Sequence, residues 1–379
     1  MKEIIFTQEH KTSFGSAISR LNLGWSQHLA KRGYRPVVVD PINITRFVSS
    51  KNFSRSKTNQ KRIRIIVQNQ NKILIINIGF HYKALAGNFL KESIKANSPY
   101  FIWCHVNLDN DYHQKDPQYL SVKKEHRYYL NHNLCQGVFC CSKNVAKNLS
   151  NIVNDREKIH IIYPLIQSCR KPNGIKCQKG DLLFVGRLSP EKNAGLLVKA
   201  AKALLRTYPS LNLNIVGEGP EKEELQALAR SLKLEKNIHF LPFLPHAKIL
   251  QLIQNHKIVC LPSLTESFGM VLTEAMLQET PVIGSNIEGI NEITRNGKYG
   301  LLFEKNSLSD LTKKISWGLE NYPVIKKRTL EAKGHLQKKY SAEKQLFTLE
   351  NVILHKSFFN PINLPIIHQS NSIISHLAR

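Results

Sequence analysis

Acidic residues are scarce in this sequence relative to basic ones. Its 379 residues include 54 Lys and Arg but only 28 Asp and Glu, which gives a formal net charge of +26. The imbalance is strongest between residues 41 and 100, where eleven Lys or Arg accompany a single acid, Glu92. Such a charge attracts polyanions: nucleic acid, anionic lipid or an acidic glycan. No nucleic-acid-reading motif and no interleaved aromatic rings accompany it, so we expect no nucleic acid partner. Two explanations of the positive charge stay open: a basic surface exposed to solvent, and a surface that contacts a membrane.

Long apolar runs and paired cysteines are also missing. No uninterrupted apolar run approaches the roughly 18 residues of a membrane-spanning helix, and residues 1–10 lack the pattern of a signal peptide. We therefore expect a cytosolic protein that is long enough for two domains. The seven cysteines are odd in number and form no C-x-x-C pair, which favours free thiols over disulfides or a zinc site.

The first half of the chain alternates short apolar strands with helical segments, the order of a Rossmann-like domain. Helices are predicted at residues 16–32 and 84–96, and from Lys143 to Leu149 after an N-cap at Ser142. Two strands, 62–67 and 72–78, flank a Gln-Asn-Gln-Asn turn and are predicted to pair as a hairpin. The other predicted strands are 3–7, 36–39, 100–106, 137–141 and 158–163.

The second half carries two cations in a glycine-containing turn. A strand predicted at residues 181–185 leads into the segment 186–193 (GRLSPEKN), and a helix is predicted from residue 194 to 208. Arg187 and Lys192 therefore precede a helix amino terminus. A guanidinium that binds two oxygens and an ammonium point charge, placed at such an end, suit a diphosphate.

Two glutamates at a fixed spacing follow the next well-defined strand. Residues 257–261 (KIVCL) predict a buried strand, and residues 270–278 predict a helix that begins after Gly269. Glu266 precedes this helix and Glu274 lies within it, with seven residues between the two. The amino end of the helix directs unpaired N–H groups into the crevice where open α/β sheets bind ligands.

In order and spacing, these E-x7-E and G-R-L-x-x-x-K-N motifs resemble those of the retaining GT-B glycosyltransferases of family 4, the glycosyl transferases group 1. The resemblance is strong from residue 181 to 303 and loose from 1 to 165. It implies an α/β protein with two Rossmann-like domains facing a cleft. The implied boundaries are an acceptor-side domain at 1–165, a linker at 166–180, a nucleotide-sugar-binding domain at 181–340, and a segment at 341–379 whose helix crosses back to the first domain.

The resemblance also implies an enzyme. It would move a hexose or N-acetylhexosamine from a UDP- or GDP-linked donor to a glycan or lipid-linked acceptor, in surface polysaccharide or lipopolysaccharide synthesis at the inner face of the membrane. No cofactor is expected besides the nucleotide sugar as co-substrate. Two alternatives stay open: another GT-B enzyme, such as a phosphorylase or sugar-nucleotide epimerase, and a non-catalytic basic binding protein that kept the fold.

Site residues follow from the matched motif positions. The resemblance implies that Glu266 lies by the donor sugar, that Glu274 holds the ribose hydroxyls, and that Arg187 and Lys192 hold the donor phosphates. His105, at a strand end, is implied to lie beside the sugar. The alternative is a core histidine whose hydrogen bonds are made within the protein. The remaining implied donor-binding residues are Gly15, Gly186, Gly217, Pro242, Phe243, Ser267, Phe268, Gly269, Met270 and Val271.

Two features of the first half fit the family less well. The first loop has only Gly15 where relatives usually carry paired glycines, so a simple turn residue is the alternative there. Asp109 and Asp111 have the D-x-D spacing of a metal site in the other glycosyltransferase fold, GT-A. No metal is predicted, because cations and a helix dipole stabilise the diphosphate in GT-B proteins. Contact with acceptor hydroxyls is the other interpretation of these two acids.

Overall fold

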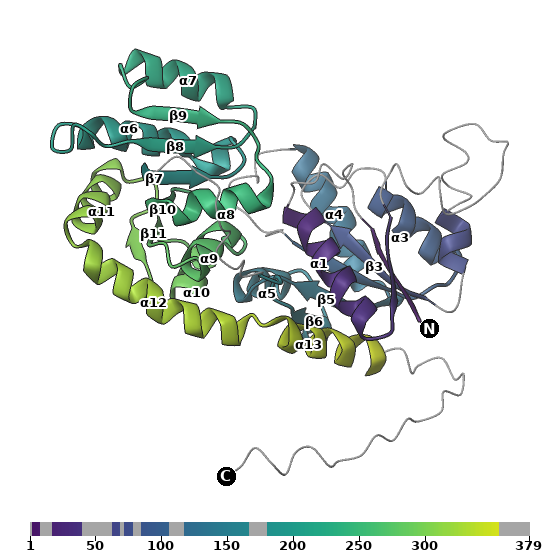
Figure 1. Cartoon of the computed structure of the whole chain (residues 1–379). Coiled ribbons are helices and arrows are strands. Elements are labelled where there is room, and N and C mark those ends of the chain that lie inside the picture. The colour runs from purple at the N-terminus through teal and green to yellow at the C-terminus, as the bar shows by residue number, and fades with distance from the viewer. Residues whose placement is uncertain are drawn as a thin grey trace, which may run out of the picture.

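The computed structural model describes residues 2–7, 17–39, 63–68, 72–78, 85–105, 117–166 and 180–355. Its architecture is two parallel six-stranded sheets, each flanked by helices, that lie beside one another (Figure 1). The N-terminal sheet has the strand order β2-β1-β3-β4-β5-β6, and the C-terminal sheet has the order β12-β11-β10-β7-β8-β9. Strand-helix-strand alternation produces parallel sheets because each crossover helix returns the chain to the same edge.

The N-terminal sheet is built from apolar strands that are buried on both faces. Phe6, Ile75 and Trp103 lie on one side of it, and Ile76 and Ile102 lie on the other. Its strands are β1 (Glu3–Thr7), β2 (Arg35–Val39), β3 (Lys72–Ile78), β4 (Tyr100–Cys104), β5 (Cys135–Cys140) and β6 (Ile159–Ile161). Its helices are α1 (Ala17–Lys31), α3 (Leu85–Lys95), α4 (Pro117–Asn131) and α5 (Lys143–Leu149).

The segment before β3 differs from its prediction. Residues 63–68 are helical, so the strand expected at 62–67 and its hairpin with β3 are wrong. Ile63, Ile66 and Val67 are buried while Arg64 and Ile65 are exposed, which is the spacing of a helix with one core-facing side. A six-residue run of this kind contains too few turns for its periodicity to distinguish helix from strand. β3 pairs in parallel with β1 and β4 instead.

The C-terminal sheet repeats the pattern with shorter strands. They are β7 (Gly180–Val185), β8 (Leu213–Val216), β9 (Ile238–Leu241), β10 (His256–Leu261), β11 (Val282–Ser285) and β12 (Leu301–Phe303). Its helices are α6 (Ala194–Leu204), α7 (Lys222–Ser231), α8 (His246–Gln254), α9 (Met270–Leu277), α10 (Glu288–Thr294), α11 (Leu308–Glu320) and α12 (Tyr322–Lys339).

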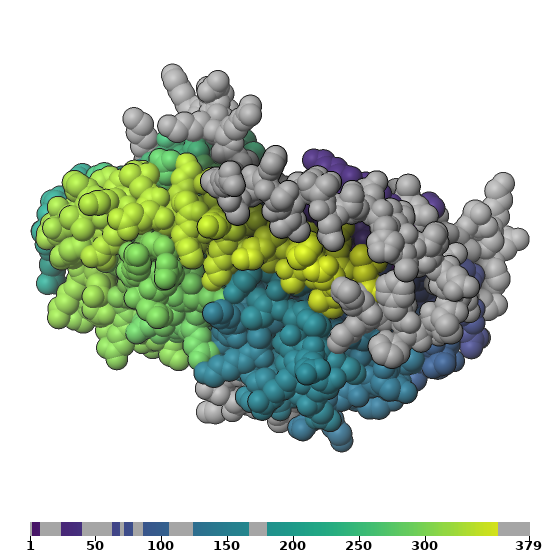
Figure 2. Space-filling model, turned by 90° about the horizontal axis from the view of Figure 1, so that it is seen from below, coloured from purple at the N-terminus to yellow at the C-terminus, as the bar shows by residue number. Residues whose placement is uncertain are grey.

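The last helix lies on the N-terminal half. Figure 2 shows the yellow residues near the C-terminus extending from the green part of the surface to the blue N-terminal part. α13 (Ala342–His355) places Leu346, Leu349 and Ile353 in the same buried cluster as Phe6 and Trp25. The chain therefore passes between its two halves both after β6 and after α12.

Two expectations about surfaces can be compared with the structure. α3 buries Phe89 and Leu90 in the core, so Phe89 is not available for contact with a membrane surface. Four of the eleven basic residues from Arg46 to Lys95 lie in the described ranges: Arg64, Lys72, Lys91 and Lys95. The five described cysteines are buried and form no disulfide with one another. Within the described ranges, no helix combines the length and the apolar character needed to cross a bilayer.

Candidate functional site

The two loops with the specific motifs meet at one edge of the C-terminal sheet. β7 and β10 are neighbours, with Leu182 opposite Ile258, so the loops that follow them leave from the same carboxyl edge. The backbone N–H of Leu264 donates to the Glu191 carbonyl at 2.8 Å. Lys192 Nζ lies 2.5 Å from Glu266 Oε2, with both side chains mostly shielded from solvent. The structure thus joins one predicted phosphate ligand to the first glutamate of E-x7-E.

The second predicted phosphate ligand is exposed. Arg187 follows Gly186 at the end of β7 and forms no ion pair with any residue in the described part of the chain. Asn193 adopts a left-handed conformation with φ of 51° and begins α6. Two cations therefore lie at the start of this helix, and only Lys192 has a carboxylate partner. Such an arrangement favours an anion.

Two of the predicted glycines are in backbone contact. Gly217 has a φ of 151°, and a Cβ at this position would lie 1.9 Å from the Gly186 carbonyl oxygen. No side chain fits between the turns that follow β7 and β8. The chain can therefore bring the two turns together at the edge of the sheet only because residue 217 is glycine.

The loop before α9 is held on several sides. Gly269 has φ of 82° and ψ of 50° at the N-cap position of α9. The Ser267 carbonyl accepts a 2.6 Å hydrogen bond from the Ser142 hydroxyl of the N-terminal half, and Phe268 is buried. Met270 and Val271, in the first turn of the helix, are half-buried. The amino end of α9 is thus fixed beside Glu266.

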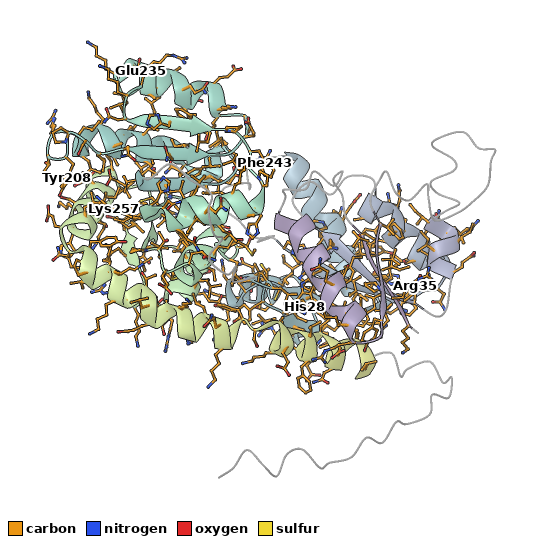
Figure 3. The ribbon with its side chains drawn as sticks, in the orientation of Figure 1. His28, Arg35, Tyr208, Glu235, Phe243 and Lys257 are labelled. Carbon is orange, nitrogen blue, oxygen red and sulfur yellow. The ribbon has the colours of Figure 1, made fainter. Side chains whose placement is uncertain are left out.

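Glu274 has a partner that the sequence did not reveal. Its side chain is 5% exposed, and its Oε1 lies 3.0 Å from Nε2 of His246, the first residue of α8. Pro242 and Phe243, just before α8, are exposed, and Figure 3 shows Phe243 on the side of the C-terminal half that faces the N-terminal half. The only signal for His246 is its place directly after this predicted donor-binding segment.

His105 lies at the carboxyl end of β4, with its ring stacked on Trp103 at a centroid distance of 5.7 Å. Its Nε2 lies 2.6 Å from Asn77 Oδ1, and Asn77 Nδ2 donates to the Thr7 carbonyl. Because the Asn77 oxygen can only accept, His105 must carry its proton on Nε2. Burial lowers the pKa of His105 to about 4, so the ring is neutral at physiological pH.

Three predicted positions lie outside the described residues: Gly15 and the two acids Asp109 and Asp111. Within the described ranges, no group of three or more His, Cys, Asp or Glu has the geometry of a metal site. The structure therefore brings Lys192 and Glu266 into direct contact, Gly186 and Gly217 into backbone contact, and Glu274 against His246.

The family described as glycosyl transferases group 1 matches residues 166–335. This part of the chain belongs to that family. The match to the glycosyl transferases group 1 confirms the resemblance inferred from the two motifs, and it includes Arg187, Lys192, Glu266 and Glu274.

Three curated relatives each match part of the chain. An uncharacterized glycosyltransferase of Haemophilus influenzae is 30% identical over 170 residues, 45% of this chain and 47% of that protein. A glycogen synthase of Mycobacterium tuberculosis is 32% identical over 156 residues, 41% of this chain and 38% of that protein. A D-inositol 3-phosphate glycosyltransferase of Acidothermus cellulolyticus is 35% identical over 145 residues, 36% of this chain and 32% of that protein. The chain matches less than half the length of each of these three relatives.

Solved structures resemble nearly the whole chain. Anabaena HepE, solved with UDP and glucose, superposes with a TM-score of 0.73 at 17% identity and covers 94% of this chain and 100% of that one. Sucrose-phosphate synthase from Thermosynechococcus elongatus gives 0.72 at 14% identity, with 94% and 99% covered. These likenesses establish the fold, and the predicted GT-B architecture is confirmed.

Proposed function

We propose that the protein is a retaining glycosyltransferase that transfers a sugar from a nucleotide-diphosphate sugar. The observation that carries the proposal is the 2.5 Å contact between Lys192 and Glu266, at an edge where exposed Arg187 and the amino end of α9 supply further positive charge. A donor diphosphate would place its oxygens beside the cations and its sugar beside the glutamate.

The proposed chemistry depends on the charge that develops on the leaving group. When the bond between the sugar and the diphosphate breaks, negative charge accumulates on the nucleoside diphosphate. Arg187, Lys192 and the N–H groups at the start of α9 stabilise this charge, and their effect is larger when water is excluded. Glu266 orients the donor sugar and shields positive charge that forms at its anomeric carbon.

Three further residues are assigned to the donor. Glu274 accepts hydrogen bonds from the ribose diol, and His246, 3.0 Å away, holds its carboxylate in place. His105 is neutral with its proton on Nε2, so its Nδ1 lone pair is suited to accept a hydrogen bond from a sugar hydroxyl. Phe243, which is exposed after β9, is assigned to the nucleobase of the donor.

The donor nucleotide is proposed to be uridine diphosphate or guanosine diphosphate. Anabaena HepE has been solved with UDP-glucose, which supports UDP-sugars as the first donors to test. The acceptor is proposed to be a glycan or lipid-linked sugar in surface polysaccharide or lipopolysaccharide synthesis, reached at a membrane surface. The likeness to the lipopolysaccharide outer core galactosyltransferase WaaB, with a TM-score of 0.59, supports the fold and carries no information on the acceptor.

The proposal is tested by incubating the purified protein with labelled UDP-, GDP- and ADP-sugars and measuring hydrolysis and transfer to added glycans. We expect one nucleotide to be hydrolysed preferentially, with retention of anomeric configuration in the product detected by NMR. An epimerised nucleotide sugar would instead assign the protein to the epimerases. Nucleotide binding without turnover of any donor would favour a non-catalytic binding protein.

A further inference from the structure

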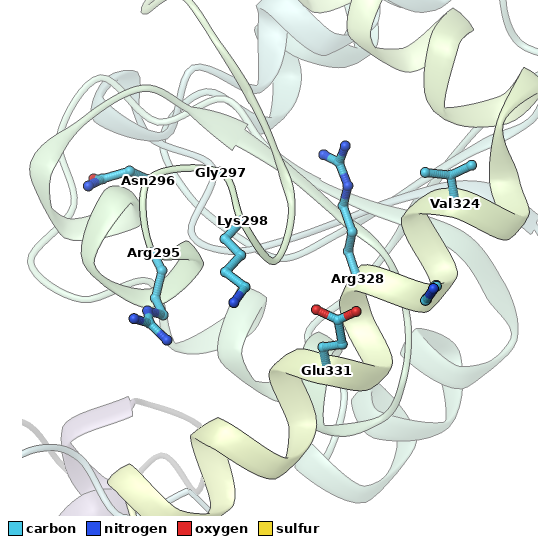
Figure 4. A pocket seen from close by; sticks show the side chains of 8 residues that line it. Arg295, Asn296, Gly297, Lys298, Val324, Arg328 and Glu331 are labelled. Atoms are coloured by element: carbon cyan, nitrogen blue, oxygen red, sulfur yellow. The ribbon is translucent and has the colours of Figure 1, made fainter.

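A concave site lies away from the candidate donor site. It has a volume of about 620 Å³ and lies between the turn that follows α10 and the outer side of α12 (Figure 4). Four cations line it, and they come from two segments of the chain. They are Arg295, Lys298, Lys327 and Arg328.

The turn after α10 holds its two cations in place. Arg295 ends α10 in a left-handed conformation, with φ of 50° and ψ of 57°. The Arg295 guanidinium carbon and Lys298 Nζ lie 5.8 and 5.7 Å from the ring centre of buried Tyr299. Arg295 Nη1 also donates to the Tyr299 hydroxyl at 3.3 Å. One aromatic ring thus positions both positive charges beside the pocket.

α12 supplies the other side through residues at helical spacing. Val324, Lys327, Arg328 and Glu331 follow one another at intervals of three, one and three residues, so they share one side of the helix. The Arg328 guanidinium carbon lies 5.8 Å from the ring centre of Trp317 on α11. This stacking limits the positions that the Arg328 side chain can adopt.

The charges in the pocket are not balanced. Glu331 is the single acid among the lining residues, and none of the four cations forms an ion pair within the described part of the chain. Elsewhere, Lys147 pairs with Glu288 and Lys222 pairs with Glu218. The positive field extends to His335, whose pKa is lowered by burial and then by the charges of Arg295, Lys339 and Lys298. Mutual repulsion of these cations would be relieved by a bound anion.

We propose that this pocket binds a phosphate-bearing group, such as a phosphomonoester or an oligophosphate. Two guanidinium groups can each bind a pair of phosphate oxygens, and two ammonium groups supply further charge. The volume exceeds that of a single phosphate, so a larger phosphorylated molecule fits. The chemistry is shared by a free phosphorylated compound and by the headgroup of a phospholipid.

The site is separate from the proposed donor site. A Cβ at Gly289, near the start of α10, would lie 2.1 Å from the Glu266 carbonyl oxygen, whereas Arg295 lies at the opposite end of this helix. α10 therefore lies between the two. The pocket does not depend on the proposed transfer reaction, but a ligand there would act on the helix that supports Glu266.

Trp317 offers a direct measurement on the full-length protein. It is 38% exposed and stacks with Arg328, whereas Trp25 and Trp103 are buried in the other half. The protein is titrated with inorganic phosphate, pyrophosphate and tripolyphosphate at constant ionic strength, with and without excess UDP. We expect a saturable change in fluorescence that persists with UDP and is lost in Trp317→Phe, while calorimetry on that variant still detects binding.

Charge variants distinguish a site from general attraction. Arg295→Ser with Lys298→Ser should weaken binding about tenfold, and Glu331→Gln should tighten it about threefold, because each changes the charge that faces the anion. Lys199→Ser with Lys202→Ser removes the same charge from the exposed side of α6 and serves as the control. Equal loss in this control would overturn the proposal.

Sedimentation with lipid vesicles distinguishes a phospholipid headgroup from a free phosphorylated compound. Sedimentation with phosphatidylcholine vesicles that contain phosphatidic acid is compared with sedimentation with phosphatidylcholine alone. A lipid headgroup is the ligand if the protein binds the vesicles that contain phosphatidic acid, loses this binding in the Arg295 and Lys298 double variant, and shows no saturable binding of free phosphates. The reverse result identifies a soluble ligand. If neither probe binds in a way that depends on these residues, the proposal is wrong.

Discussion

At the scale of single residues, the candidate donor site contains two cations in different environments. Lys192 is held 2.5 Å from Glu266, whereas Arg187 is exposed and without an ion pair in the described ranges. A diphosphate offers oxygens to both. Removal of Lys192 would also leave Glu266 without its partner, so its replacement should affect the free protein as well as the complex.

We predict that Arg187→Ala or Lys192→Ala costs about 2–4 kcal/mol of transition-state stabilisation, because each removes a preorganised charge from the leaving group. The measurement is kcat/KM with the preferred nucleotide sugar. Lys199→Ala, on the exposed side of α6, is the control. A decrease smaller than about threefold would remove the residue from the site.

We predict that Glu274→Gln weakens binding of the free nucleotide by about 1–2 kcal/mol, because a neutral amide is a poorer acceptor for the ribose diol. Calorimetric titration measures the loss. His246→Ala should cause a smaller loss, since His246 contacts Glu274 and positions it. Unchanged affinity in Glu274→Gln would exclude its ribose role.

Lys72 leads to a pH-dependent prediction. Burial lowers its pKa from 10.5 to about 7, partly offset by Glu3, and Nζ has no hydrogen-bond partner among the described residues. The unfolded chain therefore holds this proton up to higher pH than the folded one, and the wild type gains stability between pH 7 and 10.5. Lys72→Met should stabilise the fold by ~2 kcal/mol at pH 7 and below, and the gain should vanish towards pH 10.5.

Urea unfolding of the wild type and Lys72→Met at several pH values measures this difference, with Lys91→Met on the exposed side of α3 as the control. A gain that stays constant across the range would show that the charge of Lys72 is not its origin.

At the scale of elements, the sequence determined the second half well because its strands are apolar and its turns carry specific residues. The strands ending at Val185 and Leu261 and the helix after Gly269 were predicted close to their observed bounds. In the first half, the Ser142 N-cap was also predicted. Residues 63–68 were wrongly predicted as a strand, because a single short apolar run fits the residue spacing of a helix as well as that of a strand.

Contacts between distant segments could not be predicted. His246 and Glu274 are 28 residues apart, and Ser142 and Ser267 are 125 apart. Local spacing carries no information on which strand ends become neighbours in a sheet. Glu274 was therefore assigned to a site by its motif, while the histidine that holds it was not found.

Replacement of glycine by alanine should have opposite effects on stability in a turn and in a helix. Gly217→Ala should destabilise the protein by about 3 kcal/mol or more and abolish nucleotide binding, because its Cβ would collide with the Gly186 carbonyl. Gly334→Ala, within α12, meets no atom within 4 Å and should stabilise by about 0.5–1 kcal/mol. Thermal unfolding of the two variants provides the comparison, and similar midpoints would contradict the predicted contact at Gly217.

At the scale of the whole molecule, a small set of contacts joins the two halves beside the loop that carries Glu266. Glu292 on α10 accepts hydrogen bonds from the Lys143 backbone N–H at 2.8 Å and from the Tyr163 hydroxyl at 2.7 Å. The Tyr163 ring also packs against Phe268 and Tyr340, with centroids 6.0 and 4.8 Å away. Since Tyr340 lies between α12 and α13, both passages of the chain meet at this cluster.

These contacts and the Ser142 hydrogen bond to Ser267 should act together, because both fix the position of α5 and its domain relative to the Glu266 loop. Tyr163→Phe and Ser142→Ala should each cost about 1–2 kcal/mol of unfolding free energy, the second partly through loss of an N-cap. Their double variant should deviate from additivity by at least ~0.5 kcal/mol, and its radius of gyration in solution should increase as the domains separate. Ser150→Ala, which removes a 2.7 Å hydrogen bond within α5's own domain, is the control and should add independently to Tyr163→Phe. Strict additivity of the Ser142 and Tyr163 changes, with an unchanged radius, would mean that the two contacts stabilise their own segments and do not set the position of one half relative to the other.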